Sequence, residues 1–176
     1  MTVLATAALA AALAAAEPAA DPMAPFGWLR QLAGACWRTT LPDGRTTDTQ
    51  CYEERLGRFL FGTITIAPAA GGDAPGPVTR HPAGFRGEGL LAWDAAAGRI
   101  ALWTWGSDGS FGPAEAAFEG ERVHFPQPSR QDPGAPPTSR TSWKRLDADS
   151  FRVGQERLEG GAWVEKWAVV YRRVPR

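Results

Sequence analysis

The sequence contains few of the residues that most catalytic and metal-binding proteins use at their sites. It has two cysteines and two histidines among 176 residues, and Lys plus Arg equals Asp plus Glu at 19 each. A chain without net positive charge has no field that would hold a polyanion, and no basic segment here is interleaved with aromatic residues. Nucleic acid is therefore not an expected partner.

Motifs for catalysis, phosphate binding and metal binding are also missing. The segment GSDGS at 106–110 resembles a nucleophile elbow, but it lacks the final glycine and lies between two predicted strands, where a hairpin turn is expected. The sequence has no phosphate loop, dinucleotide fingerprint or paired-cysteine zinc spacing. We therefore expect no catalytic residue, no metal site and no cofactor.

What the sequence does contain is typical of an all-β protein. Apolar residues make up 44% of the chain, with eight tryptophans, and no window after residue 34 sustains a helical period over three turns. Short runs of β-branched and aromatic residues recur instead, separated by turn residues. The predicted strands are 35–41, 46–54, 58–66, 85–93, 99–105, 111–118, 122–125, 141–146, 151–157 and 162–172.

Most connections between these strands are short, which predicts a single antiparallel meander of about ten strands that closes into a barrel. Two connections, 67–84 and 126–140, are long and rich in Pro and Gly. In a meander every second connection lies at the same end, so both long connections are predicted at one mouth of the barrel. A short amphipathic helix before the first strand, with Trp28, Leu29 and Leu32 on one face, is predicted at the other end.

The first 20 residues have the pattern of an export signal. An uncharged Ala/Leu run ends in small residues, with an A-x-A cleavage site at 14–16 and a second possible site after Ala20. Glu17 and Pro18 interrupt the run before it could span a membrane. We expect a signal peptide at 1–20, one domain at 25–176, no transmembrane segment in the mature chain, and a periplasmic or secreted location.

The two cysteines fit an oxidising compartment. If Asp43 and Gly44 are the midpoint of a hairpin turn, Cys36 and Cys51 lie directly opposite each other on the two strands. Pro42 cannot donate a backbone hydrogen bond, so the loop is expected to widen and to close at Leu41 and Thr46. The thiols then lie at a narrow pair, which predicts a disulfide; two buried free thiols are the alternative.

Several segments resemble the lipocalin-like, or calycin, barrels, and in particular small bacterial domains of that type. They are LAGACW at 32–37, GRFLFG at 57–62, SWKRLDADSFR at 142–152 and the closing run 159–173. The resemblance implies a barrel that holds a ligand. It also implies that a C-terminal arginine, here Arg172 or Arg173, covers Trp37 by a cation–π contact; packing of Trp37 against Trp28 is the alternative.

The expected function is binding of a small, mostly apolar or amphipathic molecule in the barrel cavity. Glu165 draws attention because strict alternation puts an acid on the same face as several aromatic residues. His81 lies in the first long connection. The candidate ligand-binding residues are Trp103, Trp105, Trp143, Trp163, Trp167, Tyr171, Glu165 and His81.

Other functions stay open at this point. The aromatic residues could fill the barrel completely and leave a packed protein-interaction module of the cell envelope. An enzyme would use Glu165 or His81 as general acid or base, although no second catalytic group can be placed near either. Haem binding through a histidine, as in the nitrobindin group of calycins, is a minor alternative, and His124 is expected on the exposed polar face.

Overall fold

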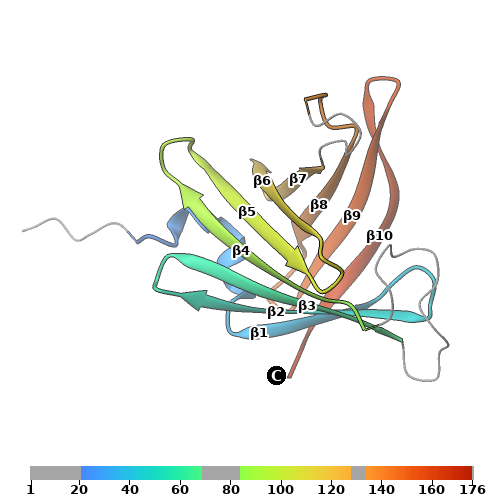
Figure 1. The fold of residues 1–176 in the computed structure, drawn as a ribbon, viewed down its shortest axis with the longest axis horizontal. Helices are drawn as coiled ribbons and strands as arrows, with labels where there is room; N and C mark the ends of the chain where they lie inside the picture. The colour runs from blue at the N-terminus through green and yellow to red at the C-terminus, as the bar shows by residue number, and fades with distance from the viewer. Residues whose placement is uncertain (1–20, 69–83, 128–133, 176) are drawn as a thin grey trace, which may run out of the picture.

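The chain folds into one closed antiparallel β-barrel. The computed structural model describes residues 21–68, 84–127 and 134–175. Ten strands follow one another around the barrel in chain order, and β1 pairs with β10 to close it (Figure 1). The predicted all-β meander barrel with one short N-terminal helix is therefore confirmed. The elements are η1 (Ala24–Leu32), β1 (Ala35–Thr40), β2 (Thr46–Arg55), β3 (Phe59–Pro68), β4 (Arg86–Asp94), β5 (Arg99–Gly106), β6 (Phe111–Glu119), β7 (Arg122–Gln127), β8 (Ser139–Arg145), β9 (Ser150–Glu159) and β10 (Ala162–Val174).

The helix η1 differs from the predicted amphipathic helix in its period. It is a 3₁₀ helix, and its buried side chains, together with Met23 just before it, recur every third residue: Met23, Phe26, Leu29 and Leu32. Three residues per turn is the 3₁₀ repeat, and η1 is kinked at Gly27, whose φ of 52° and ψ of −131° are not helical. The repeat and the kink together place these side chains in one buried stripe. Trp28, which a period of 3.6 places on the buried face, is half-buried beside that stripe. Its indole Nε1 donates to the carbonyl of Glu121.

The apolar stripe of η1 plugs one end of the barrel, which we call the η1 end. Phe26, Leu29 and Leu32 join one core with inward-facing residues from every strand except β8, whose Trp143 packs against that core. The opposite end, where the β1–β2 turn lies, is called the far end. The strands that flank both long connections also end there, as predicted from the meander. Residues 69–83 of the first connection and 128–133 of the second lie outside the described residues.

The β1–β2 hairpin forms as the turn chemistry predicts. The Leu41 amide donates to the carbonyl of Thr46, and Asp43 accepts hydrogen bonds from the Thr46 amide and hydroxyl. Cys36 pairs directly with Cys51, and the two form a disulfide. The bond lies on the outer face of the barrel, because Trp37 and Gln50 of the next pair point inward. The expected disulfide is therefore confirmed.

A C-terminal arginine does cover the tryptophan of β1. The Arg173 guanidinium lies 4.6 Å from the centre of the Trp37 ring, and Nε pairs with Asp149 at 2.9 Å. Its Nη2 also donates to the carbonyl of Ala148 at 3.1 Å. Of the two arginines left open by the resemblance, Arg173 makes this contact. Its position fastens the end of β10 to β1 beside η1.

A β-bulge in β10 changes the face on which two candidate residues lie. The pairing with β9 shifts between Glu165 and Trp167, so that Lys166 is an extra residue. Residues before the bulge are turned over relative to those after it. Strict alternation put Glu165 and Trp163 on the same face as Trp167, and this prediction is wrong. Trp167, Val169 and Tyr171 face inward, whereas Trp163 and Glu165 face outward.

Candidate ligand-binding site in the barrel interior

The interior of the barrel is packed at the η1 end and accessible towards the far end. At the η1 end Leu60, Ile100 and Val123 are 0% exposed. Towards the far end the inward residues Ile64, Thr104, Ala114, Thr141 and Trp167 are each only half-buried. Solvent therefore reaches the inner surface in the far half of the barrel, and this accessible part is the candidate site.

One wall of the candidate site is built from very small residues. On β4, β5 and β6 the inward positions towards the far end include Gly89, Gly112 and Ala114. Gly87 and Gly106 also face inward, but the Phe85 ring covers them, since a Cβ added there would meet it at 3.0 Å and 2.6 Å. A Cβ atom added to Gly112 would meet no other atom within 4 Å. This inward glycine therefore borders open space, which is what a ligand-holding interior requires.

The adjoining wall, on β7, β8 and β9, is polar. The amide Nε2 of Gln127 donates to the hydroxyl of Thr141 at 3.0 Å, and the Ser139 hydroxyl donates to Gln127 Oε1 at 3.3 Å. The Thr141 hydroxyl in turn donates to Gln155 Oε1 at 3.3 Å. These uncharged side chains can exchange hydrogen-bond partners, so they can serve the polar atoms of a ligand.

A buried carboxyl group faces the interior from β2. The Tyr171 hydroxyl donates to Asp48 Oδ2 at 2.7 Å, and Gln50 Nε2 donates to the same oxygen at 3.2 Å. The Tyr52 hydroxyl donates to Gln50 Oε1 at 2.6 Å and extends the chain. Asp48 is 8% exposed, and its second oxygen Oδ1 has no hydrogen-bond partner. Burial raises the pKa of Asp48 from 3.8 to about 6.

Aromatic rings form the floor between this carboxyl group and the packed core. Tyr171 stacks on Phe151 with ring centres 5.0 Å apart, and Trp143 lies 5.5 Å from Phe151. Trp143 also contacts Phe125 at 4.9 Å and the edge of Tyr52 at 6.4 Å. A ligand in the far half of the barrel would therefore meet aromatic surface next to Asp48.

The structure brings together three of the residues predicted from the sequence. Trp143, Trp167 and Tyr171 all face the interior. Asp48 and Gln50 were not predicted to face the interior, because residues 46–51 read Thr-Thr-Asp-Thr-Gln-Cys and are polar on both faces. Without a contrast between the two faces, alternation gives no signal for which side chains point inward.

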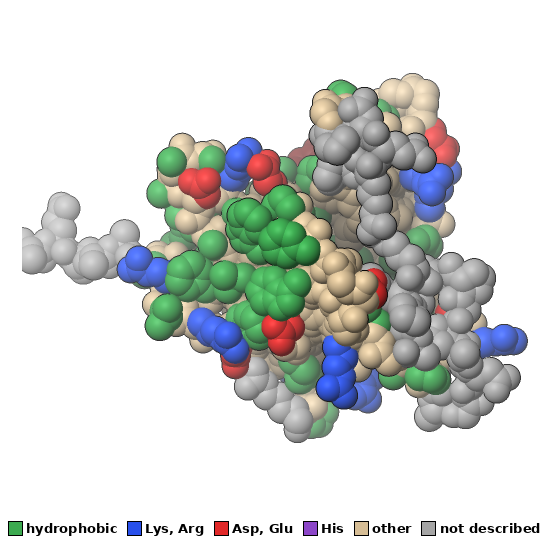
Figure 2. All heavy atoms as spheres, viewed as in Figure 1, with side chains coloured by type: hydrophobic (Ala, Val, Ile, Leu, Met, Phe, Trp, Pro, Cys, Tyr) green, Lys and Arg blue, Asp and Glu red, His purple; other side chains and the backbone are tan. Residues whose placement is uncertain are grey.

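Trp103 and Trp105 lie on the outer surface of the barrel, not in its interior as expected. Their inward neighbours are Leu102 and Thr104, and the two indoles are 43% and 38% exposed. With Phe111, which is 70% exposed, they form an outer aromatic patch. Figure 2 shows hydrophobic side chains gathered on this face over β4 and β5. Alternation in the sequence identified two faces of this strand. Because both faces are apolar, the sequence does not indicate which of them is buried.

A hollow of about 780 Å³ lies beside this patch, on the outside of β1 to β5. The disulfide, Phe61, Leu90 and Trp105 border it. Trp105 Nε1 donates to Glu88 Oε2 at 2.8 Å, and the Arg55 guanidinium covers the Phe61 ring at 3.7 Å. Both polar groups are thus already engaged with the aromatic residues of the patch.

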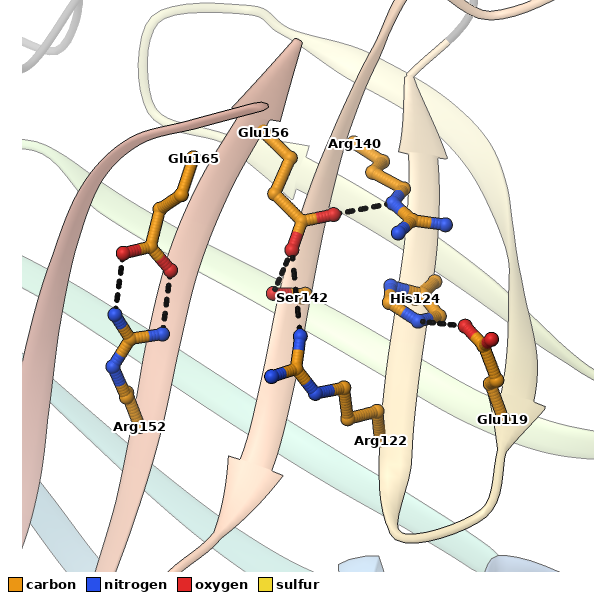
Figure 3. A network of polar contacts seen from close by, with 8 residues as sticks. All are labelled: Glu119, Arg122, His124, Arg140, Ser142, Arg152, Glu156 and Glu165. Atoms are coloured by element: carbon orange, nitrogen blue, oxygen red, sulfur yellow. Dashed lines mark hydrogen bonds and ion pairs between the residues drawn. The ribbon is translucent and has the colours of Figure 1, made fainter. Parts of the chain in front are cut away.

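Glu165 lies in an outer polar network and not beside the interior aromatic residues. Arg152 donates to both of its oxygens, one of them at 2.6 Å. This hydrogen bonding with Arg152 lowers the pKa of Glu165 below its ordinary value. Figure 3 shows the pair on the outer side of β9 and β10. An ionised and doubly paired carboxylate is poorly suited to act as the acid or base considered for it.

The same network contains His124, which is buried and not exposed as predicted. His124 Nε2 lies 3.0 Å from Glu119, on the outer face of β7 (Figure 3). Glu156, paired with Arg140, and Ser142, which donates to Glu156 at 3.1 Å, lie in the same network. Burial, and then the charge of Arg140, lower the pKa of His124. The ring is buried although it lies on the outer face, and strand alternation does not predict burial of this kind.

The remaining candidates are placed as follows. Trp163 is on the outer face, where the Arg140 guanidinium lies 4.4 Å from its ring centre. His81 lies outside the described residues. Within the described part of the chain, no group of three or more His, Cys, Asp or Glu side chains could hold a metal ion. Across the same residues, no helix combines the length and apolarity needed to span a membrane.

Comparison with known proteins adds no relative. No protein-family model matches the sequence, and no curated protein matches it. Evidence on function therefore comes from the geometry of the barrel.

Proposed function

We propose that this protein binds a small molecule with an apolar body and a polar group in the far half of its barrel. The observation that carries the proposal is the contrast between the two halves of the interior. The core is packed at the η1 end, whereas towards the far end the inward side chains are half-buried and open space borders Gly112. A barrel that served only as a packed scaffold would gain stability by filling that space.

The resemblance to lipocalin-like barrels supports this function. The closed barrel and the arginine over the tryptophan of β1 are features that the resemblance implies. In our proposal Trp143, Trp167 and Tyr171 contact the apolar body, and Asp48 or the glutamine wall contacts the polar group. His81 stays a prediction for the entrance.

We also propose that the chain is exported to the periplasm or outside the cell. The Ala/Leu-rich start of the sequence supports a cleaved signal at 1–20, and the Cys36–Cys51 disulfide supports an oxidising compartment. N-terminal sequencing of exported protein should find a start at Glu17 or Asp21. Thiol titration of that protein under denaturing conditions should find no reactive thiol, and two reactive thiols would contradict the proposed compartment.

The binding proposal is tested by filling the space at Gly112. Protein purified from the periplasm is expected to carry a small-molecule adduct in native mass spectrometry, and Gly112→Phe should abolish the adduct without unfolding the barrel. Ala117→Phe is the matched control, because Ala117 lies on the outer face of the same strand and is exposed. Loss of the adduct in both variants, or in neither, would contradict binding in the interior.

A further inference from the structure

The carboxyl group of Asp48 is half satisfied. Two donors, the Tyr171 hydroxyl and the Gln50 amide, both reach Oδ2, whereas Oδ1 is buried without a hydrogen-bond partner. A buried carboxylate oxygen left without a donor is costly, because it has lost its water and gained nothing in return. The neighbours of Asp48 fix the carboxyl group while leaving one oxygen for another donor.

No basic group faces this carboxyl group among the described residues. Asp48 is paired with Thr39 on β1 and with Ile66 on β3, and Tyr171 reaches it from β10. Arg38 and Arg172 are on the outer face of their strands and exposed. The ion pairs within the described part of the chain leave Asp48 out, so among those residues its negative charge has no ionic partner.

Aromatic rings lie next to the same group. Tyr171, whose hydroxyl donates to Asp48, stacks on Phe151, and Phe151 contacts Trp143. Aromatic surface therefore continues from Asp48 into the floor of the candidate site. A carboxylate beside aromatic faces is an arrangement that recognises ammonium groups, which gain both a charge-assisted hydrogen bond and a cation–π attraction.

We propose that the ligand carries a protonated amine and that Asp48 Oδ1 accepts its N–H, while the apolar body of the ligand lies against Trp143 and Trp167. This inference rests on the proposed function and narrows it to one class of ligand. An anionic ligand would meet an uncompensated negative charge, and a neutral one would leave that charge unpaired.

Three probes of equal chain length separate these classes: decylamine, decanol and decanoate. Binding to the mature, disulfide-bonded protein is followed by tryptophan fluorescence and by calorimetry at pH 7.5. Decylamine should bind at least about tenfold more tightly than decanol, which is the effect expected of one hydrogen bond to a charged group. Decanoate should bind most weakly.

Asp48→Asn keeps the shape of the side chain and removes its charge. This variant should lose at least about tenfold in affinity for decylamine and keep its affinity for decanol, so that unfolding is excluded as the cause. Glu115→Gln is the matched control, because Glu115 is an exposed carboxylate on the outer face of β6 whose partner is Arg99. Its affinities should match those of the wild type.

The pH dependence gives an independent readout. Among the described residues, the titratable groups around Asp48 are Tyr52 and Tyr171. Burial raises the pKa of both well above the ordinary value, so they stay neutral between pH 5 and 8. Decylamine stays protonated over this range. Its affinity should fall as the pH is lowered from 7.5 to 5 in the wild type and stay constant in Asp48→Asn.

The outcomes distinguish the amine inference from the proposed function. If decanol binds and Gly112→Phe blocks it, but decanoate binds as tightly as decylamine or Asp48→Asn leaves decylamine binding unchanged, the amine inference is wrong and binding in the interior stands. If none of the three probes binds, both are overturned.

Discussion

At the scale of single residues, two side chains determine much of the behaviour of this barrel. Arg173 joins β10 to β1 through contacts with Trp37, Asp149 and the Ala148 carbonyl. Asp48 is a buried acid inside the barrel. The first should contribute to stability at every pH near neutrality, whereas the second makes stability depend on pH.

Replacement of Arg173 by Gln should destabilise the protein by about 1–2 kcal/mol, because it removes a cation–π contact and a hydrogen-bonded ion pair at once. The stability of Arg173→Lys should lie between that of the wild type and that of Arg173→Gln, since an ammonium group keeps the charge but cannot make all these contacts. Urea unfolding measures both. Arg172→Gln, on the outer face next to it, serves as control, and an equal loss in that variant would contradict a specific role of Arg173.

The raised pKa of Asp48 predicts how stability changes with pH. The folded protein holds the proton up to about pH 6, whereas the unfolded chain releases it near 3.8. Between these values the folded state binds more protons, so the free energy of unfolding falls as pH rises, by roughly 3 kcal/mol in total. Asp48→Asn should remove this fall and be more stable than the wild type at pH 7. Urea unfolding at pH 4 and pH 7 would contradict this if both proteins changed equally.

At the scale of elements, the bulge in β10 decides which residues face the interior. Lys166 turns residues 162–165 over and allows Glu165 to meet Arg152 on the outer face. Gly154 of β9 is part of the same arrangement, because a Cβ there would lie 2.9 Å from Glu165 Oε2. The bulge and this glycine together make room for the outer ion pair.

Deletion of Lys166 should therefore be far more harmful than its substitution. Without the extra residue, regular pairing would turn Trp163 and Glu165 towards the interior, at an expected cost of more than about 2 kcal/mol. Lys166→Ala keeps the bulge and loses only a partly exposed pair with Glu159, which contributes less than about 1 kcal/mol. Thermal unfolding compares the two variants, and similar midpoints would show that the bulge has no role in placing these side chains.

The sequence predicted this fold well where its signal was local. Turn residues and alternation were sufficient for the strands, their order and the pairing of Cys36 with Cys51. The candidate site was predicted less well, because it depends on which face points inward. The bulge in β10 made the predicted orientation of Glu165 wrong. The orientation of Trp103 was wrong because both faces of β5 are apolar, and that of Asp48 could not be predicted because both faces of this part of β2 are polar. Each of these errors concerns which face of a strand points inward. Pairing with the neighbouring strands determines this, and the sequence of one strand alone does not reveal it.

At the scale of the whole molecule, the closure of the barrel depends on a short seam. β1 and β10 pair over only three residues on each strand, from Cys36 with Val174 to Arg38 with Arg172. The disulfide fixes β1 to β2 on the other side of the same strand. Loss of that crosslink should therefore affect the closure of the entire barrel.

Replacement of both cysteines by alanine should lower the free energy of unfolding by about 3 kcal/mol, the value expected for a bond that spans 15 residues. Guanidinium unfolding of the oxidised wild type and the double variant measures the difference. Wild-type protein treated with a reductant should behave like the variant. Equal stability of the oxidised and reduced forms would contradict a role of the bond in barrel closure.

The plug formed by η1 has a kinetic consequence. Because Phe26, Leu29 and Leu32 close the η1 end, the interior opens only towards the far end. If a ligand binds there as proposed, it would leave by the route along which it entered, so a bulky side chain at the rim would raise the free-energy barriers to entry and to exit by the same amount. Such a change would lengthen the time to reach equilibrium and leave the occupied fraction the same. Uptake and release of the proposed ligand would therefore share one opening, and only a substitution inside the barrel would change the ratio of their rates.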